Sequence, residues 1–518
     1  MKQQSIAAIK RYRTRRLASM ATSCYYLHKR GRDEEMATLL CDGFVALGGV
    51  YIKFLQGILL RSKFLAKWQS PDRLKIFENL ESEHLDVVEV LRHELKPELL
   101  ARITMVQPEP FAAGSFGQVY YGQLSNGQPI IIKVLRPGVR ELLRYDLRLL
   151  STFSKRFFAK LYRNMNLQLD DALKEFRDAT LKETDYRQEA QFAHEMYVAY
   201  KDHKKFLVPQ TYLDLCTDDI IVQDYVPGVS VAQIIKLKEQ GYDPSDYVFD
   251  TLGSNLDNQL STLGYESIVG VFHLDRIQGD PHPGNVRLLS EDRVGLIDFG
   301  ISAKAPNEKA AFFGMMEAYD SLFKGSQTAM VMFEQAIRFF VSDLYRALKK
   351  MAKVYGKDQG KDYMSEVSAV AAQAFAEVSG TDIIEGNFVE DGSALQAING
   401  IVNKGNRFGL VMRLESSELL RAIQTYTSLV SSLGRYQAVM PTLMDKVVTD
   451  VKRLYPQKLV DTDDTISIGD AIETIMNWLE RVAERDPALF RQLMDKIKFN
   501  ASMPNVKSAA KKEQPANA

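Results

Sequence analysis

The chain has 518 residues, which at about 150 residues per domain allows two or three domains with a large core. Acidic and basic residues balance at 66 each, so no global field favours nucleic acid or another polyanion as a partner. Cys24, Cys41 and Cys216 lie far apart and form neither a disulfide framework nor a metal-ligand spacing. No apolar run reaches the roughly 18 residues of a membrane span.

Residues 1–33 form a basic N-terminal segment. Its first 32 positions carry nine Lys or Arg and no Asp or Glu, and they lack the apolar core of a secretory signal. Three interpretations stay open: a basic amphipathic helix at an anionic membrane, an organelle transit peptide, or a solvated basic helix. The expected location is therefore cytoplasmic or peripheral to a membrane, with a mitochondrion or plastid as the alternative if the segment is a transit peptide.

Residues 34–105 are predicted to be a helical extension. Apolar residues recur at three- and four-residue spacing from Glu34 to about Leu100. Lys53 and Gln56 fall three positions apart and so share a helix face. Facing inward, such polar side chains need partners. In the alternative interpretation, Lys53 reaches the surface along its aliphatic stem.

Residues 106–228 read as a small lobe with inserted helices: strand, loop, strand, Asn-Gly turn, and a third strand that carries Lys133. Small side chains let backbone N–H groups approach phosphates, and a Lys on the third strand reaches the α- and β-phosphates. The predicted phosphate loop consists of Ala112, Ala113, Gly114 and Ser115. Val and Ile around Lys133 indicate a buried strand, where an ammonium requires an acidic partner.

The partner of Lys133 is sought in the helical stretch 141–200. Glu183 and Glu189 are the candidates, six positions apart and so not stacked on one helix face. One would pair with Lys133, and the other would face metal or Lys53. Taken singly, each can also be a solvated helix charge. The strand from Asp219 then runs into an acidic-aromatic turn, whose backbone could bind an adenine edge.

Residues 229–400 are predicted to form a larger lobe, helical to about residue 270. Asp280 and Asn285 follow, five positions apart in a loop too rich in Pro and Gly for a helix or strand. A short apolar strand then delivers Asp298 of an Asp-Phe-Gly triplet. Phosphoryl-transfer sites of kinases use this order: a loop Asp near the accepting group, an Asn that holds metal, and a second metal-binding Asp.

The C-terminal region offers no further metal or nucleophile constellation. Residues 401–500 are predicted to be a helical extension, and residues 501–518 a disordered tail. No Ala-Pro-Glu triplet follows Asp298, so the peptide-substrate segment of protein kinases is expected to be absent or replaced.

Taken together, these motifs resemble the UbiB-like (AarF, coenzyme-Q-biosynthesis) family of atypical kinases over roughly residues 40–305. The Asp-Pro-His-Pro-Gly-Asn string from Asp280 and the Glu-x-Asp motif at Glu183 and Asp185 carry most of the resemblance. It implies an α+β, protein-kinase-like two-lobed fold with a helical N-terminal extension and a mostly helical C-terminal region. It also implies ATP and Mg²⁺ as cofactors, and a link to membranes and isoprenoid quinone metabolism.

The resemblance assigns roles to single residues. Lys133 resembles the phosphate-binding Lys, Asp298 and Asn285 the metal ligands, and Asp280 the catalytic-loop Asp. The nucleotide-binding set it implies adds the loop Ala112, Ala113, Gly114 and Ser115, the acids Glu183, Asp185 and Glu189, and Lys53 with Gln56, which resemble the ends of a Lys-x-Gly-Gln motif.

The sequence departs from the family pattern in three places. Leu55 replaces the Gly of Lys-x-Gly-Gln, Gly114 replaces the third Ala of an Ala-Ala-Ala-Ser loop, and Ile277-Gln278-Gly279 replaces the Phe-His-Ala that precedes the Asp. His282 is interpreted as structuring its loop rather than as a base.

The expected function is an ATP-binding kinase or ATPase acting in isoprenoid quinone or other lipid metabolism at a membrane surface. The alternatives are a pseudokinase scaffold that binds a lipid or partner protein, and a small-molecule phosphotransferase. A lipid or quinone precursor is the further partner implied, and no nucleic acid is expected. The sequence leaves the oligomeric state open.

Overall fold

A computed structural model describes most of the chain in two compact units. The described residues are 6–55, 85–114, 116–161, 166–305, 308–325, 335, 339, 342–355, 414–460, 466–485, 487–488 and 490–491. The first unit comprises residues 1–198, 208–226 and 298–301, and the second comprises residues 199–207, 227–297 and 302–518. Helices and sheets are mixed, as predicted. None of the described helices is long and apolar enough to span a bilayer. The domain limits given above stay predictions.

The first unit contains an antiparallel sheet in the order β1-β3-β4-β6, with β2 paired to β3. The strands are β1 (Ile103–Val106), β2 (Ala112–Ala113), β3 (Gly117–Leu124), β4 (Pro129–Leu135) and β6 (Ile220–Asp224). Alternate residues of β4, Ile130, Ile132 and Val134, are buried together with Val87 and Leu91 of α5 (Val87–Glu94). Since successive strand residues point to opposite faces, Lys133 lies on the other side of the sheet.

The predicted turn between β3 and β4 is present. Gly127 has a φ of +85°, and the backbone N–H of Gln128 donates to Asn126 Oδ1 at 3.0 Å. The α5 helix and α6 (Pro97–Leu100) precede the sheet, in line with the helical pattern.

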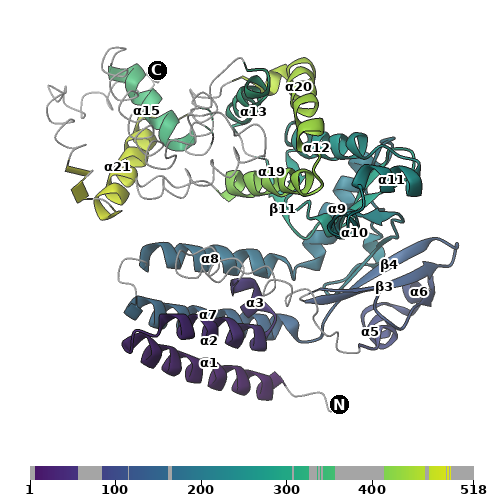
Figure 1. The fold of residues 1–518 in the computed structure, drawn as a ribbon, viewed down its shortest axis with the longest axis horizontal. Helices are drawn as coiled ribbons and strands as arrows, with labels where there is room; N and C mark the ends of the chain where they lie inside the picture. Colours follow the sequence, from purple (N-terminus) through teal and green to yellow (C-terminus); the bar gives the residue numbers. More distant parts are fainter. Residues whose placement is uncertain are drawn as a thin grey trace, which may run out of the picture. The chain divides into compact units, whose positions relative to one another are not determined.

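The rest of the first unit is helical. The helices α1 (Ile6–Lys29), α2 (Asp33–Leu47), α7 (Val139–Leu161) and α8 (Asn166–Lys182) lie alongside one another, with α3 (Val50–Phe54) between them (Figure 1). Helix α9 (Tyr186–Tyr200) follows α8. The predicted helices in residues 141–200 are therefore confirmed.

The helical extension is interrupted where a continuous pattern was expected. Gly48 and Gly49 have φ values of +68° and +51°, so the chain turns there and α3 starts on a new axis. Glycine adopts this left-handed backbone without a Cβ penalty, which explains why the helix breaks at the pair. Residues 56–84, which include Gln56, lie outside the described residues.

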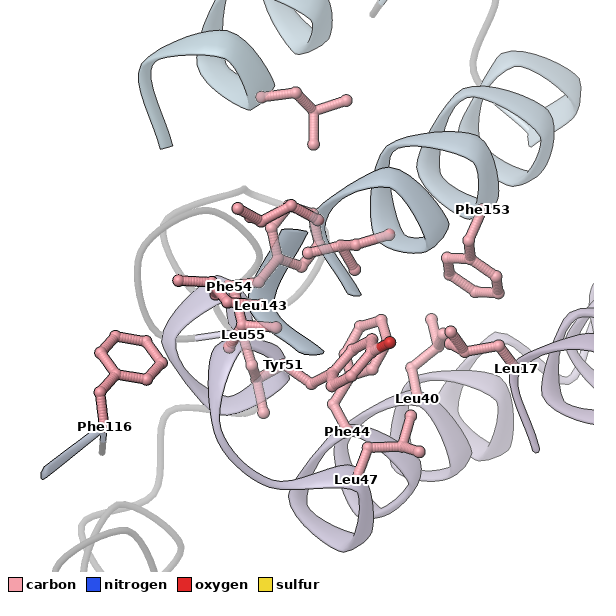
Figure 2. Close-up of a cluster of buried hydrophobic side chains, with 14 of the residues drawn as sticks. Leu17, Leu40, Phe44, Leu47, Tyr51, Phe54, Leu55, Phe116, Leu143 and Phe153 are labelled. Carbon is pink, nitrogen blue, oxygen red and sulfur yellow. The ribbon is translucent and has the colours of Figure 1, made fainter. Parts of the chain in front are cut away.

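The core of these helices is aromatic at its centre (Figure 2). Phe44 is stacked on Tyr51 and packs edge-on against Phe54 and Phe153, with ring centroids 5.8–6.0 Å apart. On α2, a Cβ at Gly43 would overlap the sulfur of Met20, so glycine there allows the close approach of α1. The same apolar cluster includes Phe116, directly before β3.

The second unit holds two small sheets and several helices. One sheet has the order β5-β10-β9-β7, and β8 pairs with β11. The strands of the two sheets are β5 (Phe206–Leu207), β7 (Val229–Ser230), β8 (Arg276–Gln278), β9 (Val286–Leu288), β10 (Val294–Leu296) and β11 (Ser302–Lys304). The strand predicted to deliver Asp298 is β10.

Helices α10 (Val231–Glu239), α11 (Pro244–Leu252) and α12 (Leu256–His273) confirm the helical stretch after residue 229. The later described helices of the unit are α13 (Lys309–Phe323), α15 (Ser342–Tyr355), α19 (Leu414–Ser432), α20 (Tyr436–Leu454) and α21 (Ile468–Arg485). Helices α15 and α21 lie against each other (Figure 1). The buried residues of their contact are Leu344, Leu348, Trp478, Leu479 and Val482. The predicted tail, residues 501–518, lies outside the described residues.

Candidate functional site

Lys133 lies at the centre of a charged cluster in the first unit. Its Nζ donates to both carboxylate oxygens of Glu189, at 2.7 and 3.0 Å, and lies 3.5 Å from Asp298 Oδ2. The Lys133 side chain is 20% exposed and that of Glu189 is 4% exposed, so the pair is largely removed from water. The acidic partner that the strand pattern required for Lys133 is therefore Glu189, on α9.

Burial and ion pairing shift the pKa values of Lys133, Glu189 and Asp298 in opposite directions. Burial lowers the pKa of Lys133, but Asp298 and Glu189 outweigh it, so this pKa lies well above its ordinary value. Burial raises the pKa of Glu189 to about 7 against the opposing effect of Lys133. Burial also acts to raise the pKa of Asp298, yet Lys133 and the N–H of Gly300 bring it below its ordinary value. Asp298 is thus an ionised carboxylate.

A second ion pair joins the helical extension to the same unit. Lys53 on α3 donates to Glu183 Oε2, and its ammonium lies 4.7 Å from the centroid of the Phe116 ring. The two charged side chains are 25% and 26% exposed. Lys53 therefore has the acidic partner that an inward-facing Lys needs, while its side chain stays partly exposed. Lys53 also contributes to the lowered pKa of Asp298.

The segment Asp298-Phe299-Gly300 packs closely against Glu189 and helix α9. The Gly300 N–H donates to Asp298 Oδ1 at 3.0 Å, and a Cβ at Gly300 would lie 3.2 Å from Glu189 Oε2. Phe299 is buried and packs edge-on against Phe192 at 5.9 Å. Helix α9 therefore supplies both the carboxylate for Lys133 and the aromatic contact for the residue after Asp298.

Asp185 starts helix α9. Its Oδ1 accepts from the backbone N–H of Gln188 at 3.0 Å, and its carbonyl accepts from the N–H of Glu189 at 3.0 Å. A carboxylate in this position satisfies a free N–H of the first turn and interacts favourably with the helix dipole. In this structure Asp185 is an exposed cap, and any nucleotide contact remains a prediction.

Sequence reasoning missed two residues that hold this region together. Arg140 on α7 donates from Nε and Nη2 to the carbonyl of Thr184, at 3.1 and 3.0 Å, and pairs with Asp219. Tyr186 is buried, and its ring centroid lies 5.1 Å from Lys133 Nζ. The signal for Tyr186 was available, because a Tyr directly before the Arg-Gln-Glu run faces inward when Glu189 does.

The small-residue segment before β3 differs from the prediction of a loop. Ala112 and Ala113 form strand β2, paired with Val119 and Gln118, and the N–H of Gly114 donates to Gly117 O at 2.9 Å. Ala112 and Ala113 are therefore strand residues where the sequence predicted a loop. Ala112, Ala113 and Gly114 are exposed, whereas Ser115 lies outside the described residues.

In the second unit, the loop from Asp280 to Asn285 is closed around one carbonyl. Asp280 O accepts from Gln278 Nε2 at 2.6 Å, His282 N at 2.7 Å and Asn285 Nδ2 at 3.2 Å. Gln278 also accepts from the Asp280 N–H at 3.0 Å. The buried Gln278, a position where the sequence departs from the family, thus fixes the backbone of Asp280.

The end of this loop is more regular than predicted. Asn285 ends a 3-10 turn over Pro283–Asn285, and its carbonyl accepts from the N–H of Ile297 at 3.0 Å. The imidazole of His282 accepts from the Gly284 N–H at 3.2 Å, which confirms its loop-structuring role. Within the ranges that the structure describes, no three His, Cys, Asp or Glu side chains form a metal-binding group.

Comparison with known proteins identifies the domain. Residues 78–331 match the family model of the ABC1 atypical kinase-like domain. The chloroplastic protein ACTIVITY OF BC1 COMPLEX KINASE 3 of Arabidopsis thaliana is 28% identical over 307 residues, covering 58% of this chain and 40% of the relative. An uncharacterized Mycobacterium tuberculosis protein is 29% identical over 267 residues, covering 50% of this chain and 52% of the relative. The chain therefore spans about half the length of these relatives or less.

Among solved structures, a Mycobacterium tuberculosis protein in complex with erythromycin is similar with 24% identity and a TM-score of 0.38, covering 58% of this chain and 72% of the other. The family match agrees with the motifs at Lys133, Glu183, Asp280 and Asp298. Residues 78–331 therefore carry an ABC1 atypical kinase-like domain, and the chain resembles the UbiB-like family.

Proposed function

We propose that this protein binds ATP with Mg²⁺ and acts as an atypical phosphotransferase or ATPase. The observation that carries the proposal is the Lys133 ammonium, held by Glu189 at 2.7 Å with Asp298 at 3.5 Å. A strand Lys fixed by a helix Glu beside the Asp of an Asp-Phe-Gly triplet is the arrangement that phosphoryl-transfer enzymes of the kinase class require.

The residues of the first unit fit a bound nucleotide. Lys133 would contact the phosphates, and the exposed backbone around Ala112, Ala113 and Gly114 would approach them without large side chains in the way. Ser115 and Gln56 also belong to the proposed nucleotide-binding residues, and both lie outside the described residues. Glu183, Asp185, Glu189 and Lys53 would position this set rather than all touch nucleotide.

The donor chemistry also fits magnesium. Mg²⁺ prefers oxygen ligands, and in nucleotide sites one or two protein ligands and phosphate oxygens hold it. Asp298, ionised and with a pKa below its ordinary value, and the amide oxygen of Asn285 are proposed as the protein ligands. When bound, the ion would neutralise charge on the phosphates.

Asp280 is proposed to orient the accepting hydroxyl or water. Its backbone is fixed by Gln278, His282 and Asn285, so its carboxylate starts from a rigid loop. Such positioning is the main contribution a protein makes to phosphoryl transfer. The acceptor is proposed to be a lipid or isoprenoid quinone precursor at a membrane surface, in line with the family resemblance.

A second candidate is a pseudokinase scaffold. Leu55 replaces the glycine of the family motif and is buried, which changes the packing directly after Lys53. A scaffold would bind nucleotide or partner without turning ATP over.

Turnover separates the two candidates. Mg²⁺-dependent release of phosphate from ATP should be detected with the purified full chain and should fall at least about a hundredfold in Asp298→Asn. Asp250→Asn, an exposed Asp on α11, serves as the matched control and should keep wild-type turnover. ATP binding with no turnover in any variant would favour the scaffold. The lipid assignment is tested separately, since unchanged quinone and isoprenoid pools in a deletion strain would contradict it.

A further inference from the structure

The apolar side of helix α1 is buried in the core of the first unit. Leu17, Met20 and Cys24 recur at three- and four-residue spacing and are at most 4% exposed. They belong to the cluster that contains Phe44 and Phe153 (Figure 2). The apolar side of this helix is therefore occupied, and the open question is what its other side does.

The opposite side of α1 is basic and aromatic. Exposed residues that can form hydrogen bonds lie on this side at helical spacing, and Arg30 follows directly after the helix. We call these residues the basic face: Arg11, Tyr12, Arg15, Arg16, Ser19, Thr22, Ser23, Tyr26, Lys29 and Arg30. Tyr12 and Tyr26 are 55% and 59% exposed. Within α1 the face runs from Arg11 to Lys29, so it is about 27 Å long at ~1.5 Å per residue.

Among the residues that the structure describes, no ion pair balances the charge of the basic face. The acids that pair with α1 are Glu141 with Lys10, Asp146 with Arg13 and, at the C-terminal end of the helix, Asp33 with His28. Among the carboxylates that the structure describes, none forms an ion pair with Arg11, Arg15 or Arg16. Although the whole chain is neutral, this face therefore presents a local positive field.

We propose that the basic face of α1 docks on the headgroups of an anionic phospholipid membrane. A straight helix offers a flat, extended surface, which matches a plane of anionic headgroups. Arg and Lys supply electrostatic attraction, and Tyr side chains favour the boundary between headgroups and acyl chains. Since the apolar side is already buried, the helix would lie on the surface rather than insert, and binding should weaken with salt.

This inference rests on the proposed function only for the membrane surface, and it does not depend on ATP binding. The test therefore omits nucleotide. Cosedimentation of the full chain is measured with vesicles of phosphatidylcholine alone and of phosphatidylcholine with phosphatidylserine, at low and high salt. Wild type should bind only the anionic vesicles and should be released by salt.

The decisive variant is Arg11→Gln/Arg15→Gln/Arg16→Gln. Each neutralised charge should weaken binding about fivefold, so the triple variant should bind about a hundredfold more weakly. The control Arg92→Gln/Lys96→Gln/Lys204→Gln removes the same charge from exposed positions elsewhere and should bind like wild type. Both variants are first checked for wild-type melting temperature.

Two outcomes would overturn the proposal. One is equal binding of the Arg11/Arg15/Arg16 variant and its control. The other is tighter binding of the basic face to an RNA duplex than to the anionic vesicles at equal phosphate concentration. A failure of ATP binding in the wild-type protein would leave the vesicle result unaffected, so the two claims fail separately.

Discussion

The ammonium of Lys53 is paired with the carboxylate of Glu183, 130 residues later in the sequence. This contact joins the helical extension to the segment that leads into α9, whose Glu189 holds Lys133. Two lysines and three acids, Glu183, Glu189 and Asp298, thus form one interacting set within the first unit. The extension is part of the proposed site's charge balance, not a separate appendage.

A double-mutant cycle should detect the contact between Lys53 and Glu183. We expect Lys53→Met and Glu183→Gln each to destabilise the protein, with a coupling energy of about 1 kcal/mol, because both groups are only about a quarter exposed. The measurement is equilibrium unfolding in denaturant of the wild type, the single variants and the double variant. Strict additivity would mean that the pair contributes nothing.

Asp146 should be essential for holding α1 in place. Its carboxylate accepts from Arg13 on α1 and from the hydroxyl of Tyr51 on α3, and it is 3% exposed. Asp146→Ala should cost about 3 kcal/mol of unfolding free energy, because it leaves the guanidinium of Arg13, which is only 16% exposed, without its counter-charge. Glu141→Gln removes the 61% exposed partner of Lys10 and should cost less than about 0.5 kcal/mol. Equal losses in the two variants would contradict this account.

Gly117 should tolerate no side chain because of Tyr186. A Cβ there would overlap the Tyr186 hydroxyl and lie 2.8 Å from the carbonyl oxygen of Val134. We expect Gly117→Ala to cost about 2 kcal/mol, and Tyr186→Phe in the same chain to recover part of this loss. Gly114→Ala is the matched control, since its Cβ would meet only Gly117 O, at 3.8 Å. Thermal unfolding of the four proteins gives the comparison, and no recovery in the double variant would exclude the Tyr186 contact as the cause.

Stability should carry a pH dependence that originates at Glu189. Burial raises its pKa from 4.5 to about 7, so the folded protein binds a proton here that the unfolded chain has released. The contribution of Glu189 to stability should therefore fall as pH rises from about 4.5 to about 7, by up to about 3 kcal/mol. Denaturant unfolding of wild type and Glu189→Gln across this range measures the difference. A difference that stays constant with pH would show that the pKa of Glu189 is not raised.

The strands and helices around Lys133 could be predicted because local patterns determine them. The alternation in β4 and the Asn126-Gly127 turn are readable from sequence, and so is the apolar spacing of α7 to α9. The partner of Lys133 could not be chosen between Glu183 and Glu189, because the choice depends on how α9 is rotated against the sheet. Arg140 on α7 holds the start of α9 through hydrogen bonds to the carbonyl of Thr184, and this long-range contact leaves no local pattern.

Other differences between the predicted and the observed structure have a physical reason that can be recognised in the sequence. The Gly48-Gly49 pair within a helical pattern is a common breaker, and it ends α2 as such pairs do. Ala112 and Ala113 form a strand because the N–H of Gly114 donates to Gly117 O and brings β2 beside β3. The sequence alone did not distinguish this strand from a loop. The spacing of Leu17, Met20 and Cys24 also predicts a packed face for α1. In the structure this helix contributes to the core with one side and exposes its basic side.

The central claim is that the Lys133 cluster binds nucleotide, and isothermal titration calorimetry with Mg-ATP tests it most directly. Wild type should bind, and Lys133→Met should bind at least about tenfold more weakly, because the ammonium that is proposed to contact the phosphates is lost. Lys96→Met, an exposed Lys of the same unit, should bind like wild type. Equal affinity of wild type and Lys133→Met, with both proteins folded, would contradict the account.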